Sequence, residues 1–415
     1  MNIINYTEKE KIFFDILFFL IAIFPISLLL GSAIINILII IIDLLFLYIF
    51  FKKKEFKLEN KISFYILLIF WVSLLVNLIY SSDFVNSFSR CVGFIRFAIL
   101  ALAIQFFIEN SSSKKMNKVF LTWSIIFFIV SFDLIFEFIM GFNLFGNTSY
   151  MPGRLSSFLG DELKIGHYYL AFNLLAISLV YYYFKNNTLL YFILFSTTFI
   201  SLIIGERANF IKFIFMTFFF TYLFEKKNFY FKSISIFLII FFLSIFISIN
   251  NAYKERFWVM FGSIVIEKKN ISKMINSTPY GGHWNAAWEI FNDNKIFGVG
   301  LKNYRKVSGE QKYYNKDVLY SKSRQTTHPH QLHLEFLSET GIFGFIFFAY
   351  MVISSIIVGS KNYIKSRNLY CLSSLLFFCA STLSILPAGS FFTTYAATIF
   401  WINYGVFMAK TNKFY

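Results

Sequence analysis

The stretch AIINILIIIIDLLFLYIFF, residues 33–51, carries one charged side chain, and the basic segment KKKEFKLENK (52–61) follows it directly. A run of about twenty apolar residues has the length that a helix needs to cross roughly 30 Å of hydrocarbon. Inside a bilayer the peptide groups have no water to bind, so a spanning segment satisfies them by folding as a helix. This stretch therefore predicts a helix that spans a membrane.

Similar apolar runs recur along the whole chain. Of its 415 residues, 57% are hydrophobic and 14% are charged, whereas soluble domains carry about a quarter charged residues. We therefore expect an all-α polytopic membrane protein with about 12 transmembrane helices. The predicted spans are 12–30, 33–51, 63–80, 92–109, 119–140, 166–184, 189–204, 208–224, 233–249, 341–358, 369–387 and 392–408.

Basic residues gather in alternate connections between these spans, for example 52–61, 111–118, 225–232 and 360–367. The positive-inside rule then predicts cytoplasmic N- and C-termini. We expect the net charge of +16 to meet anionic lipid headgroups, and nucleic-acid binding is the weaker interpretation.

The spans divide the chain into three parts. Residues 1–249 are expected to form transmembrane helices 1–9, and residues 341–415 transmembrane helices 10–12. Residues 250–340 are the one long connection, which predicts a large loop domain on the outer face of the membrane.

The segment HPHQLHLEF, residues 328–336, holds three of the five histidines. Pro329 predicts that a helix begins there, with Thr327 or His328 as its cap and His330 in the first turn. The positive end of a helix disfavours imidazolium, so His330 is expected to stay neutral near pH 7, as a general base requires.

Two alternatives remain open for these histidines. They are also typical of solvated loop or interface residues. A metal site with Glu335 and Glu339 as further ligands is the other alternative, although the segment lacks a fixed metal-binding spacing.

Cations near the predicted ends of spans are candidates for anion binding. Arg207 and Lys212 lie in IIGERANFIKF (203–213), and Arg154 lies in a charged, glycine-rich connection. Such residues are costly near hydrocarbon unless they face a polar cavity, and a guanidinium binds phosphate oxygens in a bidentate manner. The alternatives are a membrane anchor paired with Glu206 for Arg207, and ion pairing within its own connection for Arg154. Arg96 falls inside a predicted span, so it requires an interior partner.

Four segments together resemble the O-antigen ligase and O-antigen polymerase superfamily of bacterial envelope glycosyltransferases. They are GRLSSFLGDELKIG (153–166), GERANFIKF (205–213), KIFGVGLKNY (295–304) and HPHQLHLEFLSETGIFG (328–344). The resemblance implies a GT-C-like, metal-independent transferase without a cofactor, which takes a glycan from undecaprenyl diphosphate on the periplasmic face and inverts the anomeric centre.

The resemblance also implies roles for individual residues. His330 matches the histidine that acts as base on the acceptor hydroxyl, and Arg207 matches an arginine that holds the diphosphate. Arg256 or Arg305 would be the second, loop arginine. His283 stands where relatives often have arginine. The candidate substrate-binding residues are therefore Arg207, Arg256, Arg305, Arg154, Lys212, His328 and His283, with His330 as the catalytic residue.

The sequence favours an O-antigen ligase that joins a polysaccharide to lipid A core in the bacterial inner membrane. A polymerase of the same superfamily, which uses a second lipid-linked glycan as acceptor, is the nearest rival. A lipid-linked sugar transporter or flippase would carry charges at mid-membrane on several helices. Here the charges gather at one face, which favours the enzyme.

Overall fold

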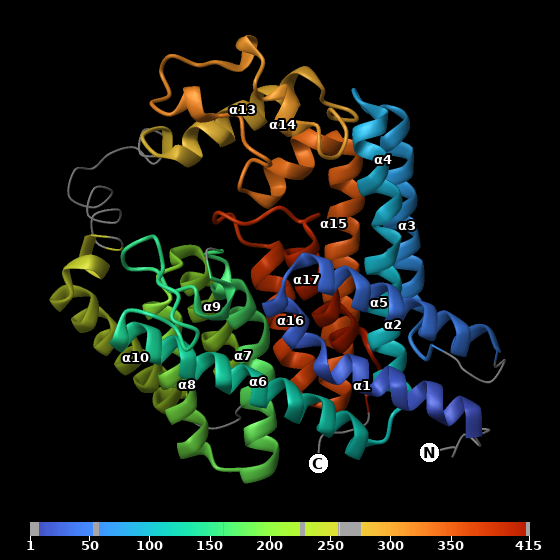
Figure 1. Ribbon diagram of the computed structural model, residues 1–415, viewed down its shortest axis with the longest axis vertical. Coiled ribbons are helices and arrows are strands. Elements are labelled where there is room, and N and C mark those ends of the chain that lie inside the picture. Colours follow the sequence, from blue (N-terminus) through green and yellow to red (C-terminus); the bar gives the residue numbers. More distant parts are fainter. Residues whose placement is uncertain are drawn as a thin grey trace.

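The computed structural model describes residues 8–52, 58–160, 162–224, 229–255, 257 and 275–411. These ranges are built of helices and contain no strand (Figure 1). The helices are α1 (Glu8–Leu30), α2 (Ser32–Lys52), α3 (Lys61–Ile79), α4 (Phe84–Gly93), α5 (Ile95–Asn110), α6 (Ser113–Met140), α7 (Ile165–Phe184), α8 (Asn187–Ile203), α9 (Arg207–Phe224), α10 (Phe229–Ile249), α13 (Pro279–Asp293), α14 (Tyr304–Val307), α15 (Leu332–Ser366), α16 (Leu369–Thr382) and α17 (Thr394–Met408).

The fold is that of a polytopic membrane protein, as predicted. Within the described residues, seven helical segments are long and apolar enough to cross a bilayer. They are α1, α2, α3, the α4–α5 pair, α6, α7 and α15. Each of the twelve predicted stretches contains a helix, while the number that cross the membrane stays a prediction.

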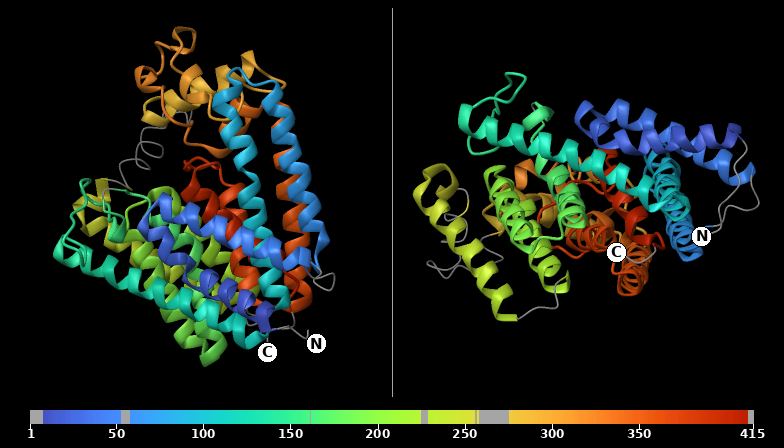
Figure 2. Two further views of the ribbon diagram at one scale, coloured as in Figure 1. Left: turned by 45° about the vertical axis from the view of Figure 1, so that its right-hand side comes forward. Right: turned by 90° about the horizontal axis from the view of Figure 1, so that it is seen from below.

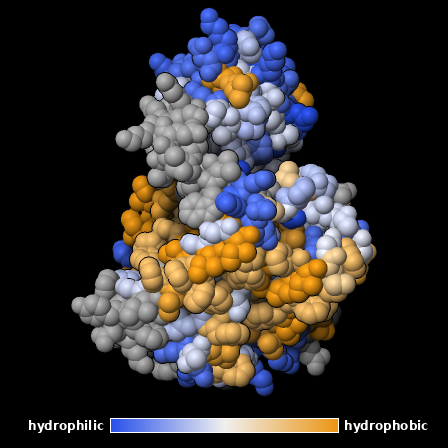
Figure 3. Space-filling view, turned by 90° about the vertical axis from the view of Figure 1, so that its left-hand side faces the viewer, coloured by the Kyte–Doolittle hydropathy of each residue, from blue (hydrophilic) through white to orange (hydrophobic). Residues whose placement is uncertain are grey.

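The helices form one packed body. α1, α2 and α6 lie side by side across one face, and α5, α7, α16 and α17 fill the interior (Figures 1 and 2). On the face drawn in Figure 3, apolar side chains gather over this helical part and polar side chains lie above it. Apolar side chains that point outward in this way are expected to contact lipid tails.

Residues 275–331, here called the loop domain, sit over one end of the helical body (Figure 1). A small core of its own includes Ala286, Ala287 and Ile290. The Asn303 amide fastens the loop domain to the helical body, because it donates to the hydroxyls of Ser81 and Ser87 at 2.9 and 3.1 Å. The KIFGVGLKNY element thus positions the domain above α4.

One predicted span is too long. The sequence predicts a helix over 369–387, but α16 ends at Thr382 and residues 383–393 form a non-helical connection, here called the α16–α17 loop. Pro387 cannot continue a hydrogen-bonded helix and disfavours helical backbone at the residue before it. Leu383, Ile385 and Leu386 are apolar enough to extend the hydropathy signal past the true end of the helix.

Candidate active site

A cavity of about 950 Å³ opens between the loop domain and the helical body. Six parts of the chain contribute to its wall: the start of α2, α4–α5, residues 154–167, the start of α9, the loop domain, and the α16–α17 loop with the start of α17. The polar and charged residues of the wall are Ser32, Ser89, Arg90, Arg96, Arg154, Lys164, His167, Glu206, Arg207, Asn209, Lys212, Tyr280, Lys302, His330, Thr393, Thr394 and Tyr395.

Four of the predicted site residues line this cavity: His330, Arg154, Arg207 and Lys212. His328 and His283 stand directly behind the His330 ring, with ring centroids 4.1 and 5.3 Å from it. These six residues come from four segments of the sequence that lie far apart, and the fold brings them together.

Two predicted loop arginines are not placed at the cavity. Arg305 is exposed on α14 and is not part of the wall. Arg256 lies outside the described residues. The proposed second phosphate-binding arginine of the loop therefore has no counterpart at this site among the residues that the structure describes.

His330 lies ahead of a helix and not inside its first turn, which corrects the prediction. α15 begins at Leu332, and Gln331 is the N-cap, since its side-chain oxygen accepts the Leu334 amide at 2.6 Å. The expected caps, Thr327 and His328, are therefore wrong. A glutamine cap was not foreseen because serine, threonine, aspartate and asparagine lead at this position.

The backbone of His330 adopts a left-handed conformation with φ 56°. Such a conformation is uncommon for a residue with a side chain. The carbonyl of His330 accepts the amide of Ala388, in the α16–α17 loop, at 2.9 Å. Loop and histidine are thereby joined, and this bond helps to hold the conformation that directs the imidazole into the cavity.

Glu335 fixes the same loop from the first turns of α15. Its buried carboxylate accepts the hydroxyl of Ser390 and, at 2.9 Å, the amide of Phe391. Glu335 is thus engaged in structure and not in the metal cluster that the sequence left open. Within the described part of the chain, no three His, Cys, Asp or Glu side chains are placed to hold a metal ion.

Burial keeps His283, His328 and His330 neutral. The sequence had predicted a neutral His330 from the helix dipole instead. Burial, with smaller contributions from His328 and His283, lowers the pKa of His330 to about 3. Burial also lowers the pKa of His328 to about 4 and lowers that of His283. All three imidazoles are therefore uncharged at neutral pH.

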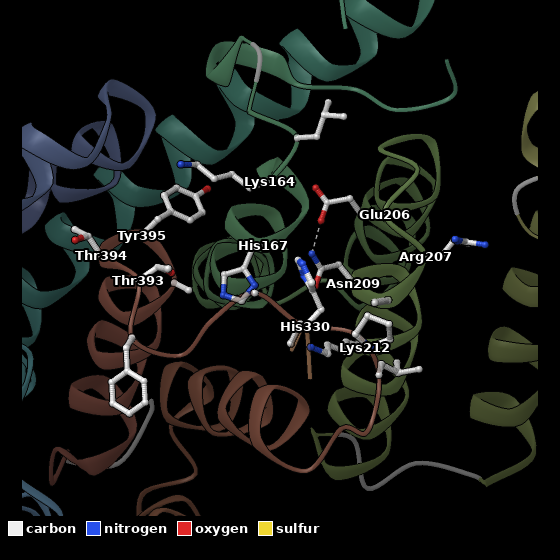
Figure 4. A pocket seen from close by; sticks show the side chains of 18 of the residues that line it. Lys164, His167, Glu206, Arg207, Asn209, Lys212, His330, Thr393, Thr394 and Tyr395 are labelled. Carbon is white, nitrogen blue, oxygen red and sulfur yellow. Dashed lines mark hydrogen bonds between the residues drawn. The ribbon is translucent and has the colours of Figure 1, made fainter. Parts of the chain in front are cut away.

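On the α9 side of the cavity, a network centred on Glu206 organises the cations. Glu206 pairs with Arg154 at 3.1 Å, and it accepts the Asn209 amide at 2.5 Å (Figure 4). Arg154 also donates to the carbonyl of Leu163 at 2.6 Å. The sequence left open, as an alternative, that Arg207 pairs with Glu206; Figure 4 shows the Arg207 side chain on the far side of α9 from His330.

Sequence reasoning missed several wall residues. Tyr280, Lys302 and the α16–α17 loop carried no signal, because their proximity to His330 arises only in three dimensions. Arg96 does line the cavity, and Asp43 of α2 is its electrostatic partner inside the helical body. That partner agrees with the expectation for a charge within a span.

The cavity has the electrostatics of an anion site. Among the described residues of its wall, seven carry an arginine or lysine charge and one, Glu206, carries a carboxylate. The start of α9 also faces the cavity, and helix N-termini favour anions. A neutral histidine beside such a group of cations suits a reaction in which a hydroxyl attacks and an anion leaves.

A family model described as O-antigen ligase matches residues 190–349. This segment runs from α8 into α15 and contains Arg207, Lys212, His283, His328 and His330. A search of curated proteins found no match. Over residues 190–349 the chain is thus similar to the O-antigen ligase family.

Proposed function

We propose that this protein is an O-antigen ligase, which transfers a polysaccharide from undecaprenyl diphosphate to lipid A core. The observation that carries the proposal is the neutral His330 in a cavity whose wall holds seven cations and one carboxylate. Such a cavity fits a diphosphate beside a base. The match to the O-antigen ligase family supports the same reaction class.

In the proposed reaction, His330 accepts the proton of an acceptor hydroxyl while that oxygen attacks the anomeric carbon of the donor sugar. The bond between the anomeric carbon and the diphosphate oxygen breaks, and the electron pair leaves with the diphosphate. Arg154 and Lys212, together with the amides at the start of α9, stabilise the charge that develops on the leaving group. The reaction inverts the anomeric centre and requires neither a metal nor a cofactor.

The donor itself is expected to make His330 a better base. A pKa of about 3 describes the imidazole in the empty cavity, whereas a general base works best with a pKa near the operating pH. A bound diphosphate places negative charge beside the imidazole, and such a charge raises the pKa of a histidine. Proton transfer is thereby coupled to donor binding.

We place the cavity on the periplasmic face of the inner membrane, with both termini in the cytoplasm. The support is the distribution of lysine and arginine in the connections between spans. Undecaprenyl diphosphate then enters the cavity from the membrane, where its lipid tail remains.

The test is an assay of purified protein in lipid nanodiscs with undecaprenyl-diphosphate glycan. One reaction receives lipid A core as acceptor, and a second receives more carrier-linked glycan. Growth of lipid A core supports the ligase. Growth of the carrier-linked chain alone identifies a polymerase of the same superfamily, and movement of donor across the membrane without transfer would identify a transporter.

A further inference from the structure

We propose that Tyr280 and Trp284 form a platform on which a pyranose ring of the acceptor stacks beside His330. This inference rests on the proposed function and assigns a subsite to it. The two side chains lie one turn apart on α13, in the loop domain. On the same helix the sequence had predicted His283 as a site residue, but neither of these two aromatic side chains.

The geometry places this pair at the base. Tyr280 lines the cavity, and its ring centroid lies 6.2 Å from that of His330 with the ring planes at 70°. Trp284 extends the aromatic surface beyond the cavity wall, with its ring centroid 6.1 Å from that of Tyr280 and the planes at 34°. A sugar that contacts these rings brings its hydroxyls within reach of His330.

Tyr280 and Trp284 are not used for the core of the loop domain. The buried face of α13 carries Ala286, Ala287 and Ile290, whereas Tyr280 and Trp284 are half-exposed. The indole Nε1 of Trp284 is itself buried, and within the described part of the chain it has no hydrogen-bond partner. Buried indole N–H groups usually have a partner, and this one lacks a partner among the residues that the structure describes.

The platform is rigid, because α13 begins in close contact with neighbouring backbone. A Cβ on Gly281 would lie 2.4 Å from the carbonyl oxygen of Ile275, and one on Gly282 would lie 2.4 Å from that of Tyr320. Two glycines directly after Tyr280 thus permit packing that other residues would prevent. A subsite built on a fixed helix start needs little ordering when a ligand binds.

The position of the pair relative to the cations selects the acceptor over the donor. In an inverting transfer the attacking hydroxyl and the leaving group lie on opposite faces of the anomeric carbon. The diphosphate is expected at Arg154 and Lys212, near the start of α9, while Tyr280 contacts His330 from the loop domain. The C–H groups on one face of a pyranose then meet the electron-rich faces of the aromatic rings.

The first experiment compares kinetic constants of four variants in nanodiscs. Tyr280→Ala and Trp284→Ala are expected to raise the KM for acceptor about 3- to 10-fold and to leave the KM for donor unchanged. Tyr280→Phe keeps the ring and should stay near wild type. Trp288→Ala is the matched control, because Trp288 is an exposed tryptophan one turn further along α13 whose ring packs against Phe291, whereas the Trp284 ring packs against Tyr280.

An equal rise in the KM for donor would overturn the proposal, and so would a Tyr280→Phe variant as impaired as Tyr280→Ala. The second experiment does not depend on activity. It measures binding of delipidated core oligosaccharide, and of a free repeat-unit oligosaccharide, to wild-type protein and Tyr280→Ala by calorimetry.

These measurements separate the two proposals. Oligosaccharide binding that Tyr280→Ala weakens supports the platform even if no glycan transfer is detected, in which case the proposed function fails alone. Binding that is absent in wild type, or equal in both proteins, overturns the platform even if transfer is observed.

Discussion

Gly205 is the position where one added carbon should do most harm to the site. It lines the cavity with φ 76°, and a Cβ there would lie 1.9 Å from the carbonyl oxygen of Gly153. Even a tight contact of 3.0 Å requires the two segments to separate by about 1.1 Å. Gly153 precedes Arg154 and Gly205 precedes Glu206, so Gly205→Ala should displace both partners of the ion pair.

A misplacement of about 1 Å in a catalytic site costs on the order of 10²-fold in rate. We therefore expect Gly205→Ala to lower the rate of glycan transfer about 100-fold. The left-handed backbone adds a stability cost of about 1–2 kcal/mol for a residue with a Cβ. Transfer is measured with saturating donor in nanodiscs, and unfolding is followed by a thermal melt of the same sample.

Gly146→Ala is the matched control, because Gly146 has a similar φ of 80° and open space around the added carbon. It should show the backbone cost in the melt and keep nearly full transfer. Equal transfer rates for the Gly205→Ala and Gly146→Ala variants would refute the displacement argument, since backbone strain alone would then explain both.

Four further predictions concern the base and its surroundings. Burial lowers the pKa of His330 to about 3, so kcat/KM for donor should not change with pH above about pH 5 through protonation of this histidine. An ordinary histidine as the base would make kcat/KM decline below pH 6.5. Below pH 6.5 the histidines of the unfolded chain bind protons, whereas His328 and His330 in the folded protein stay neutral because their pKa values are lowered. Protonation therefore stabilises the unfolded chain, and the melting temperature should fall as the pH drops from 6.5 toward 4. A constant melting temperature would contradict the buried, neutral state. Glu335→Gln keeps one acceptor oxygen for two donors and should lower kcat about 10-fold by loosening the α16–α17 loop, with less effect on the KM for donor. Arg154→Lys keeps the charge but loses the planar fork, so the KM for donor should rise about 10-fold; an unchanged KM would remove Arg154 from the diphosphate site.

The helical architecture was predictable because the bilayer imposes both length and secondary structure on apolar runs. The predicted helix over 369–387 was too long by residues 383–387, and the error has a physical cause. Hydropathy indicates which residues avoid water, but it does not indicate where a helix ends. Leu383 and Ile385 are apolar but belong to a loop that is held by Glu335 and the carbonyl of His330. Hydrogen bonds to distant backbone leave no local pattern.

The composition of the cavity wall was predictable in part, where a residue type is unusual for its place in the sequence. His330, Arg154, Arg207 and Lys212 stood out because histidine and cations are unusual at the ends of apolar helices, and all four line one cavity. Tyr280 did not stand out, since aromatic residues make up 22% of this chain. An aromatic side chain beside a base is informative only when the base and the cavity are known.

The conformation of His330 depends on parts of the chain outside residues 190–349, the segment that matches the family model and is here called the family segment. A left-handed backbone at a residue with a side chain costs free energy and persists only where surrounding contacts determine it. Here the contacts are the Gln331 cap within residues 190–349 and the Ala388 amide beyond them. The family segment thus carries the proposed base and most of the predicted site residues, while the α16–α17 loop sets the direction of that base. For this reason the segment at residues 328–344 points to a candidate base, but residues 190–349 alone are not expected to assemble a competent site.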